Sequence, residues 1–415
     1  MTAPSPARFT AYLCTAEVFT MLGYATFPTL LLTLQQDWGM SNTEAGVVSG
    51  AYFGGYMLAV PLLTAVTDRI DARRVYVFAC MLAAIGSFGF AFAAHGFVTA
   101  AVFQSCVGAG LAGTYMPGLK ILSDHVHGPK QSRYVSFYTT SFTLGASGSF
   151  LLPIALMPAL SWQWVFAISG VGPLLAALMV WRIPPAVHAA TPTPAAGTST
   201  RTSASLAATL DFRPVLRNRQ AMGYILGYSA HCFELLGSRS WLVAFIGFAA
   251  ATHGPAVAVA PAIIAAFVNF IGMPASIFGN ELAMRHGRQR MILTYMLLSG
   301  LMSCVVGFTA PLALPLTVAC LCLYTVLVMA DSSSLTAGTV AAAAPDKRGI
   351  TLALHSTLGF GAGMISPTLF GWVLDQAGGN GVVGAWGLAY ASQGIFCLAA
   401  PLLFWLARRP PIRQA

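Results

Sequence analysis

Five ionisable side chains stand out in this chain because each lies in an apolar stretch. Glu17 falls in the first of these stretches, while His231 and Glu234, three residues apart, share a face of the seventh. Asp331 precedes several hydroxyl residues, and His355 lies in the next stretch. A carboxylate in hydrocarbon costs about 3 kcal/mol even on a lenient scale, and histidine titrates near neutral pH. These residues predict a proton or substrate pathway, with buried structural pairing as the alternative for each.

Asp331 and His355 are expected at a similar depth, where they could form an ion pair or carry protons. Asn269 can offer hydrogen bonds to a solute or to a neighbouring backbone. Arg239 or Lys120 could bind an anion, although an arginine near a helix end can also reach the membrane surface. The pathway prediction includes three further residues: Tyr24, Gln104 and Tyr228.

The composition shows what kind of chain positions these groups. Hydrophobic residues make up 57% and charged residues only 8%, whereas soluble domains carry about 25% charged residues. The mean hydropathy is +0.72, and apolar runs recur at about the 20 residues that cross a bilayer. The pattern predicts an all-α polytopic membrane protein with twelve spans, at residues 9–34, 44–66, 75–95, 97–122, 134–157, 161–182, 220–249, 257–279, 289–310, 313–337, 349–374 and 383–407.

Positive charge is confined to alternate loops. Nearly all of the 21 Lys and Arg residues fall on the side that carries both termini, so the positive-inside rule predicts cytoplasmic termini. The net charge of +9 is explained by this asymmetry without a nucleic-acid partner. The richness in Ala, Gly and Arg is typical of a GC-rich bacterial genome, which indicates the bacterial inner membrane.

Two loops at corresponding places carry related basic motifs. The first runs from Thr64 to Arg74 and the second from Asn280 to Arg288. Both resemble the G-x-x-x-D-R-x-G-R-K loop signature of the major facilitator superfamily. The matching residues are Asp68, Arg69 and Arg73 in the first copy, and Arg285, Gly287 and Arg288 in the second. Thr64 and Asp71 stand where that family usually has glycine, and Met284 replaces the acid of the second copy.

A longer internal repeat supports the resemblance. Thr143-Leu144-Gly145, with Pro153 ten residues on, is matched by Thr357-Leu358-Gly359 with Pro367. The resemblance implies the superfamily fold: twelve transmembrane helices in two pseudo-symmetric six-helix halves. We expect an N-terminal bundle at 1–182, a Pro/Ala/Thr/Ser-rich cytoplasmic linker at 183–219, and a C-terminal bundle at 220–415. The resemblance also implies that the loop motifs brace helices in one conformation, and that the protein is a monomer.

No phosphate-binding loop, nucleophile elbow or metal-protease motif is present, so the chain is not expected to be an enzyme or to need a cofactor or metal. The eight cysteines lie mostly within spans and predict no disulfide framework. The hypothesis is a secondary transporter that moves a small solute by alternating access, coupled to protons.

Two departures from drug-exporter patterns favour uptake of a small polar or anionic compound over efflux. Gln104 stands where exporters commonly have arginine, and Gly148-Ser149-Phe150 replaces a Gly-Pro element. Proton-coupled efflux of amphipathic compounds is the alternative, because aromatic residues make up 11% of the chain. A receptor that transports nothing, or a metal carrier, receives less support.

Overall fold

The computed structural model describes residues 5–67, 69–127, 131–185, 211–254 and 260–406. All regular elements in these ranges are helices. Ten helical segments within them are long and apolar enough to cross a membrane. The chain is therefore a multi-pass helical membrane protein, which confirms the prediction from composition.

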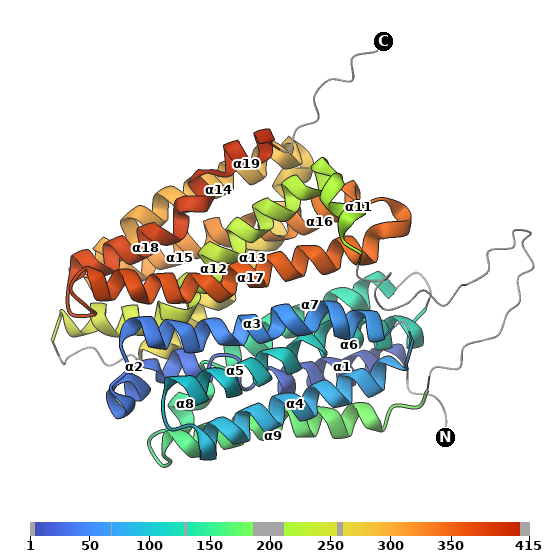
Figure 1. The fold of residues 1–415 in the computed structure, drawn as a ribbon, viewed down its shortest axis with the longest axis horizontal. Helices are drawn as coiled ribbons and strands as arrows, with labels where there is room; N and C mark the ends of the chain where they lie inside the picture. The colour runs from blue at the N-terminus through green and yellow to red at the C-terminus, as the bar shows by residue number, and fades with distance from the viewer. Residues whose placement is uncertain (1–4, 68, 128–130, 186–210, 255–259, 407–415) are drawn as a thin grey trace, which may run out of the picture.

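The helices fall into two groups, one from the chain before residue 186 and one from the chain after residue 210 (Figure 1). The first group contains α1 (Pro6–Thr20), α2 (Thr26–Trp38), α3 (Asn42–Val66), α4 (Ala72–Ala93), α5 (Phe97–Ala112), α6 (Tyr115–His125), α7 (Gln131–Gly148), α8 (Leu151–Leu156) and α9 (Trp162–Trp181). The second contains α11 (Arg213–Arg217), α12 (Arg219–Ala251), α13 (Pro261–His286), α14 (Arg288–Val306), α15 (Leu314–Ala330), α16 (Ser332–Ala342), α17 (Arg348–Gln376), α18 (Val383–Leu398) and α19 (Ala400–Leu406). Short 3-10 turns lie at Gly307–Thr309 and Pro345–Lys347.

Two expected spans, 9–34 and 134–157, are absent from these ten because each is built from two shorter helices. The first breaks between α1 and α2, and the second between α7 and α8. Proline has no N–H to donate to the carbonyl four residues earlier, and Pro28 and Pro153 stand one turn after the two breaks. At the first break, the backbone amide of Ala25 donates a hydrogen bond to Ser149 Oγ at 3.1 Å. The count of twelve spans stays a prediction.

Two further breaks occur at corresponding places of the internal repeat. One separates α5 from α6 at Gly113 and Thr114, and the other separates α15 from α16 at Asp331. The spans are otherwise continuous there, and Asp331 is the single residue between its two helices. Interrupted helices at membrane depth usually line a site or pathway. Asp331 therefore lies where the backbone itself is irregular.

The division into 1–182, 183–219 and 220–415 stays a prediction. The predicted linker contains the short helix α11, whose Val215 is buried against Ile225 and Leu354 of the second group. Residues 186–210 of that linker lie outside the described residues. We refer below to residues before 186 as the first half and to residues after 210 as the second half.

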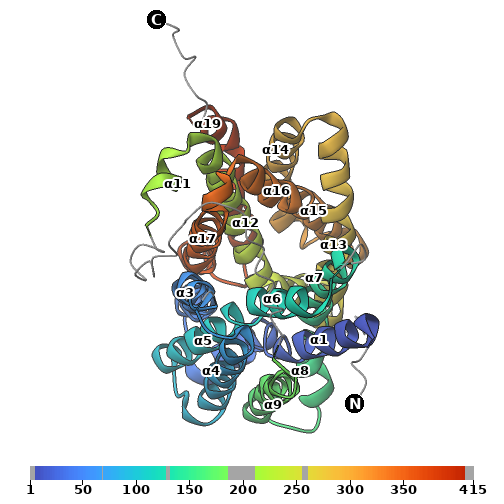
Figure 2. The same ribbon diagram turned by 90° about the vertical axis from the view of Figure 1, so that its right-hand side faces the viewer.

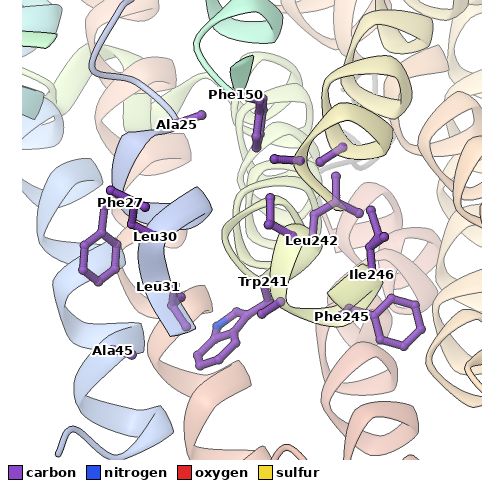
Figure 3. Packing of buried hydrophobic residues seen from close by; sticks show 14 of the residues in the cluster. Ala25, Phe27, Leu30, Leu31, Ala45, Phe150, Trp241, Leu242, Phe245 and Ile246 are labelled. Atoms are coloured by element: carbon purple, nitrogen blue, oxygen red, sulfur yellow. The ribbon is translucent and has the colours of Figure 1, made fainter. Parts of the chain in front are cut away.

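The buried apolar clusters show where the two halves meet. We call the side that carries residues 69–71 and Gly287 the motif side, and the side that carries residues 39–41 and 377–382 the opposite side. Near the opposite side, one cluster contains Phe27, Leu30 and Leu31 of α2 together with Trp241 and Leu242 of α12. Figure 3 shows Leu31 beside Trp241, where the two halves meet.

Two apolar clusters toward the motif side do not join the halves. One contains Phe9, Tyr76 and Ile183 of the first half, and another contains Ile292 and Phe404 of the second. Each is built from a single half. Figure 2, which views the motif side, shows the two groups of helices arranged around a centre lined by α6, α7, α12 and α16. The halves are thus packed together most extensively away from the motif side.

Candidate functional site

A carboxylate joins the halves on the opposite side. Asp375, near the end of α17, accepts hydrogen bonds at one oxygen from the backbone and side-chain amides of Asn42, at 3.1 and 2.8 Å. Its other oxygen accepts from the amide of Thr43 at 2.8 Å and from the Thr43 hydroxyl at 2.6 Å. A carboxylate at the start of α3 also opposes the positive end of that helix. Four bonds from a single side chain close this end of the interface.

Glycines let α3 and α17 touch along the same interface. A β-carbon built on Gly50 would lie 2.2 Å from the carbonyl oxygen of Met364, and one on Gly46 would lie 2.3 Å from that of Pro367. Any side chain at these positions would push the helices apart. The closed interface therefore depends on glycine at Gly46 and Gly50.

Arg239 lies where the two halves meet, half-buried on α12. Its guanidinium donates to the hydroxyl of Tyr24 at 3.4 Å and approaches the sulfur of Met329 at 3.9 Å. Among the described residues no carboxylate lies within ion-pair distance of it. Because unpaired cations are rarely kept inside a membrane protein without a function, Arg239 is a candidate contact for an anionic solute.

A hollow adjoins Arg239. It is lined by residues of α12, α13, α15 and α18, and its free volume is about 20 Å³, enough for a group the size of a water molecule. Asn269 also lines it and donates from its amide to Ser147 of the first half at 2.8 Å. Two predicted pathway residues, Arg239 and Asn269, are thereby placed at one site.

Asp331 forms its contact with His231. His231 Nδ1 lies 2.7 Å from Asp331 Oδ1, and both side chains are 2% exposed. Two lone pairs at that separation repel, so at least one of the two atoms carries a proton. The predicted ion pair between Asp331 and His355 is wrong, because the break before α16 turns the carboxylate toward α12 instead of α17.

His355 has other partners. Its ring stacks on Tyr228, with centroids 3.7 Å apart, and its two nitrogens lie 3.4 Å from the Thr336 hydroxyl and 3.2 Å from that of Thr339. Tyr228 also stacks against His231 at 5.8 Å. The Tyr228 ring therefore contacts both histidines, and His231, Asp331 and His355 belong to one cluster.

Glu17 is fully buried on α1, inside the first half. One of its oxygens accepts a hydrogen bond from Tyr138 at 2.7 Å and a longer one from Tyr76 at 3.4 Å. Its other oxygen has no partner in the described part of the chain. Glu17 is therefore held by aromatic hydroxyls of its own half.

Glu234 has a similar setting in the second half. It is 1% exposed, and one oxygen accepts a hydrogen bond from Ser299 of α14 at 2.7 Å. The other oxygen lacks a partner among the residues that the structure describes. Both halves thus bury a carboxyl group on their first long helix with one oxygen free to hold a proton, and both face helices of their own half.

Two remaining candidates lie elsewhere in the first half. Gln104 is buried on α5, and Lys120 is half-buried on α6. Lys120 lies nearer the motif side than Arg239 does, because it is in the last two turns of α6, whereas Arg239 is more than five turns from the start of α12. Arg239 is the better placed of the two cations to meet a solute between the halves.

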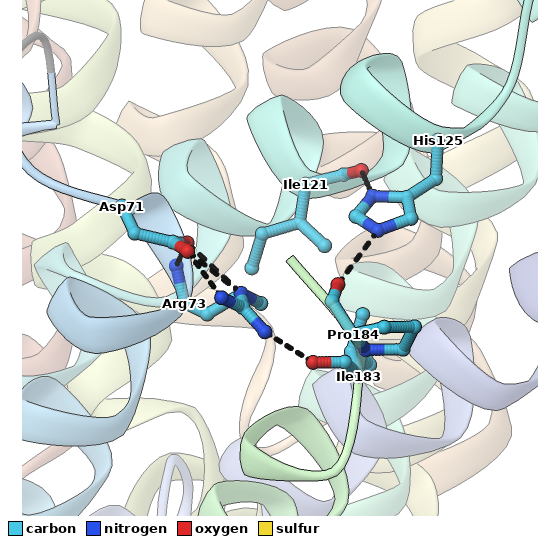
Figure 4. Close-up of polar contacts among 6 residues, drawn as sticks. All are labelled: Asp71, Arg73, Ile121, His125, Ile183 and Pro184. Atoms are coloured by element: carbon cyan, nitrogen blue, oxygen red, sulfur yellow. Dashed lines mark hydrogen bonds and ion pairs between the residues drawn. The ribbon is translucent and has the colours of Figure 1, made fainter. Parts of the chain in front are cut away.

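The first loop motif braces helices within one half (Figure 4). Arg73 forms an ion pair with Asp71 and donates to the carbonyl of Ile183, just beyond α9. Asp71 caps α4 by accepting from the amide of Arg73 at 2.9 Å. Hydrogen bonding to Arg73 lowers the pKa of Asp71 below its usual value. The residue that replaces the usual glycine therefore has a defined role here.

The second motif is more exposed. Arg285 pairs with Glu281 one turn earlier at 2.9 Å, and Gly287 adopts a φ of 96°, which favours glycine between α13 and α14. Arg288 begins α14, and its Nε has no described partner. Asp68 lies outside the described residues, and Arg69 takes part in an interaction at the end of α3. That the motifs brace helices in one conformation of the protein stays a prediction.

The comparisons with known proteins agree with this architecture. A family model described as Major Facilitator Superfamily matches residues 13–276. The chain belongs to the major facilitator superfamily. The prediction from the two loop motifs is thereby confirmed, and the protein is a membrane transporter by family.

Curated relatives in the superfamily are distant and match in part. Protein spinster homolog 3 of Danio rerio is 23% identical over 251 residues, which cover 59% of this chain and 49% of the relative. The 4-hydroxybenzoate transporter PcaK of Pseudomonas putida is 29% identical over 36% of this chain and 33% of the relative. The gallate transporter of Pseudomonas putida is 30% identical over 37% and 34%. The matched part spans about half of these relatives or less.

Solved structures of the superfamily fold match nearly the whole chain. A bacterial homolog of the human lysosomal transporter Spinster, in an inward-facing and unoccupied conformation, superposes with a TM-score of 0.74. The identity is 16%, and the match covers 98% of this chain and 96% of that one. The likeness shows the fold.

Sequence reasoning missed several residues of the site. Asp375 stands near the end of its span, where a carboxylate reads as an ordinary surface residue. Tyr324 and Tyr390 line the hollow near Arg239, but nothing in their local sequence separates them from packing tyrosines.

Proposed function

We propose that this transporter takes up a small organic anion, most specifically an aromatic carboxylate. Uptake is driven by protons that move inward together with the anion. The observation that carries the proposal is Arg239: a half-buried cation at the junction of the halves with no described carboxylate partner. A guanidinium can bind a carboxylate through two parallel hydrogen bonds. The ligand would thus provide the partner that the protein lacks.

Aromatic side chains near Arg239 favour a ligand with a ring. Tyr24, which contacts the guanidinium, packs edge-on against Tyr52 at 5.9 Å. Tyr56 and Phe360 stack across the two halves at 3.8 Å. Names of relatives point the same way, because 4-hydroxybenzoate, gallate and niacin all carry a carboxyl group on a ring. The carboxyl group that these compounds share is the group that Arg239 would bind.

The conformation fits an uptake cycle if the motif side is cytoplasmic, as the positive-inside rule predicts. The opposite side is held closed by Asp375 with Asn42 and Thr43, whereas the apolar clusters near the motif side stay within single halves. Such a state would release a solute to the cytoplasm. Opening the contacts of Asp375 while the motif side closes would admit a solute from outside.

The proton would be held by the His231 and Asp331 pair. The pair is buried, contains at least one proton, and lies two turns of α12 from Arg239. An additional proton would make the charge of the pair more positive by one unit, which favours binding of an anion nearby. Loss of that proton to the cytoplasm would weaken anion binding there. Glu17 and Glu234, each with one free oxygen inside its own half, are the further proposed carriers.

Reconstituted proteoliposomes with a pH dye inside would test this function. Under an inward proton gradient, we expect benzoate or 4-hydroxybenzoate to enter together with protons, while the amide benzamide does not. Exchange of internal protons for a cationic dye, without carboxylate flux, would instead establish the efflux alternative. Flux of neither class would refute both proposals for the substrate.

A further inference from the structure

Three buried polar groups around the hollow beside Arg239 lack hydrogen-bond partners. The hydroxyls of Tyr324 and Tyr390 and the side-chain oxygen of Asn269 form none in the described part of the chain. These residues are 3%, 0% and 3% exposed, and all three line the hollow. The Tyr324 hydroxyl approaches Ser238 without completing a bond of normal geometry.

Neither tyrosine can easily turn elsewhere for a partner. The ring of Tyr390 packs edge-on against Phe245 at 4.9 Å, Phe370 at 5.1 Å and Tyr324 at 6.1 Å. Ser238 already donates to the carbonyl of Glu234 at 2.7 Å, so it can only accept from Tyr324, whose hydroxyl oxygen would still be free to accept from a ligand. Buried polar groups without partners are costly, so they usually meet water or a ligand. The hydroxyls are therefore fixed and available at the hollow.

The chemistry of these groups defines what they can bind. A tyrosine hydroxyl can donate and accept, whereas the free oxygen of Asn269 can only accept. A ligand hydroxyl can serve both kinds of group at once, because it also donates and accepts. A methyl group of similar size can serve neither.

We infer that this hollow, with Tyr324, Tyr390 and Asn269, is a subsite for a hydroxyl group on a carboxylate that Arg239 binds. The inference rests on the proposed function and narrows its substrate class to hydroxylated carboxylates. The carboxylate lies at the mouth with Arg239, and the hydroxyl enters between α15 and α18. The hollow is too narrow to be more than a pocket for a substituent, so the remainder of the ligand lies between the halves.

Binding to the purified, detergent-solubilised protein tests the subsite with three probes: 4-hydroxybenzoate, benzoate and 4-methylbenzoate. We expect the wild type to bind 4-hydroxybenzoate more tightly than the other two. Tyr390→Phe removes only the hydroxyl, and should cut the affinity for 4-hydroxybenzoate by about 3- to 10-fold while leaving that for benzoate unchanged. Tyr324→Phe should act in the same direction.

Tyr295→Phe is the matched control. Tyr295 also has a hydroxyl without a described partner, but it lies on α14 and does not line the hollow. It should leave the preference unchanged. Unchanged benzoate binding by Tyr390→Phe shows that the variant is folded.

The outcomes separate the two proposals. If the wild type binds none of the three carboxylates, the proposed function fails and the subsite fails with it. If it binds all three equally, the hollow holds water only, and the subsite is wrong while the proposed function stands. A loss in Tyr390→Phe that is equal for 4-hydroxybenzoate and benzoate also overturns the subsite, since it shows a structural effect.

Discussion

Asp375 offers a sharp test of how the transporter closes on the opposite side. Asp375→Asn keeps one oxygen for the amides of Asn42 but replaces the other by an NH₂ group. That group cannot accept from the amide of Thr43, whose bond to the carboxylate is 2.8 Å long. The Thr43 hydroxyl can turn and accept instead. The main losses are one charge-assisted backbone bond and the negative charge at the start of α3.

The size of the effect follows from these losses. A hydrogen bond to a charged group contributes about 1.5–3 kcal/mol, and a charge at a helix N-terminus about 0.3–1 kcal/mol. Because Asp375 is only half-buried, we take a value near the lower end, about 2 kcal/mol. That corresponds to a roughly 30-fold rise in the population that is open on this side.

Hydrogen exchange measured by mass spectrometry is the assay. We expect peptides that cover Asn42 and Thr43 to exchange about 30-fold faster in the variant. Asp346→Asn is the control, because Asp346 is exposed and pairs only with its neighbour Lys347 at 3.6 Å. Unchanged exchange at Asn42 and Thr43 in Asp375→Asn would refute the assigned closing role.

Two further variants test the interface and the proton route. Gly50→Ala should lower the stability of the closed interface by about 1–3 kcal/mol through overpacking against Met364, and should slow uptake. Gly384→Ala is the control, because there is open space around Gly384. Equal uptake rates in the two variants would disprove the close contact at Gly50. Glu234→Gln should abolish proton-driven transport while exchange of substrate across the membrane without a gradient continues. Glu281→Gln, at an exposed surface pair, serves as the control, and wild-type pH dependence in Glu234→Gln would rule out the proposed role.

The fold could be predicted because its signals are long and repeated. Apolar runs, alternate basic loops and two copies of a loop motif each sample many residues, so single departures such as Asp71 or Met284 do not hide them. The breaks within spans were less visible. Pro28 and Pro153 mark two of them after the fact, but proline inside α3 at Pro61 leaves that helix continuous, so proline alone does not predict a break.

Partners of the candidate residues were harder to predict than the residues themselves. Periodicity placed Asp331 and His355 at a similar depth, yet the break at Asp331 rotated its side chain toward His231. Tyr390 could not be found at all, because its importance comes from an unused hydroxyl rather than from its neighbours in sequence. The position of a residue along its span predicts its depth in the membrane, whereas the direction of its side chain depends on how the helices rotate and pack.

Calorimetric binding of benzoate and benzamide to the purified protein tests whether Arg239 recognises a carboxylate. We expect the wild type to bind benzoate but not the neutral amide, and Arg239→Gln to weaken benzoate binding by about 2 kcal/mol or more, roughly 30-fold. Arg290→Gln, an exposed arginine on α14, should bind as the wild type does. Equal binding of the two compounds, or wild-type benzoate affinity in Arg239→Gln, would contradict the account.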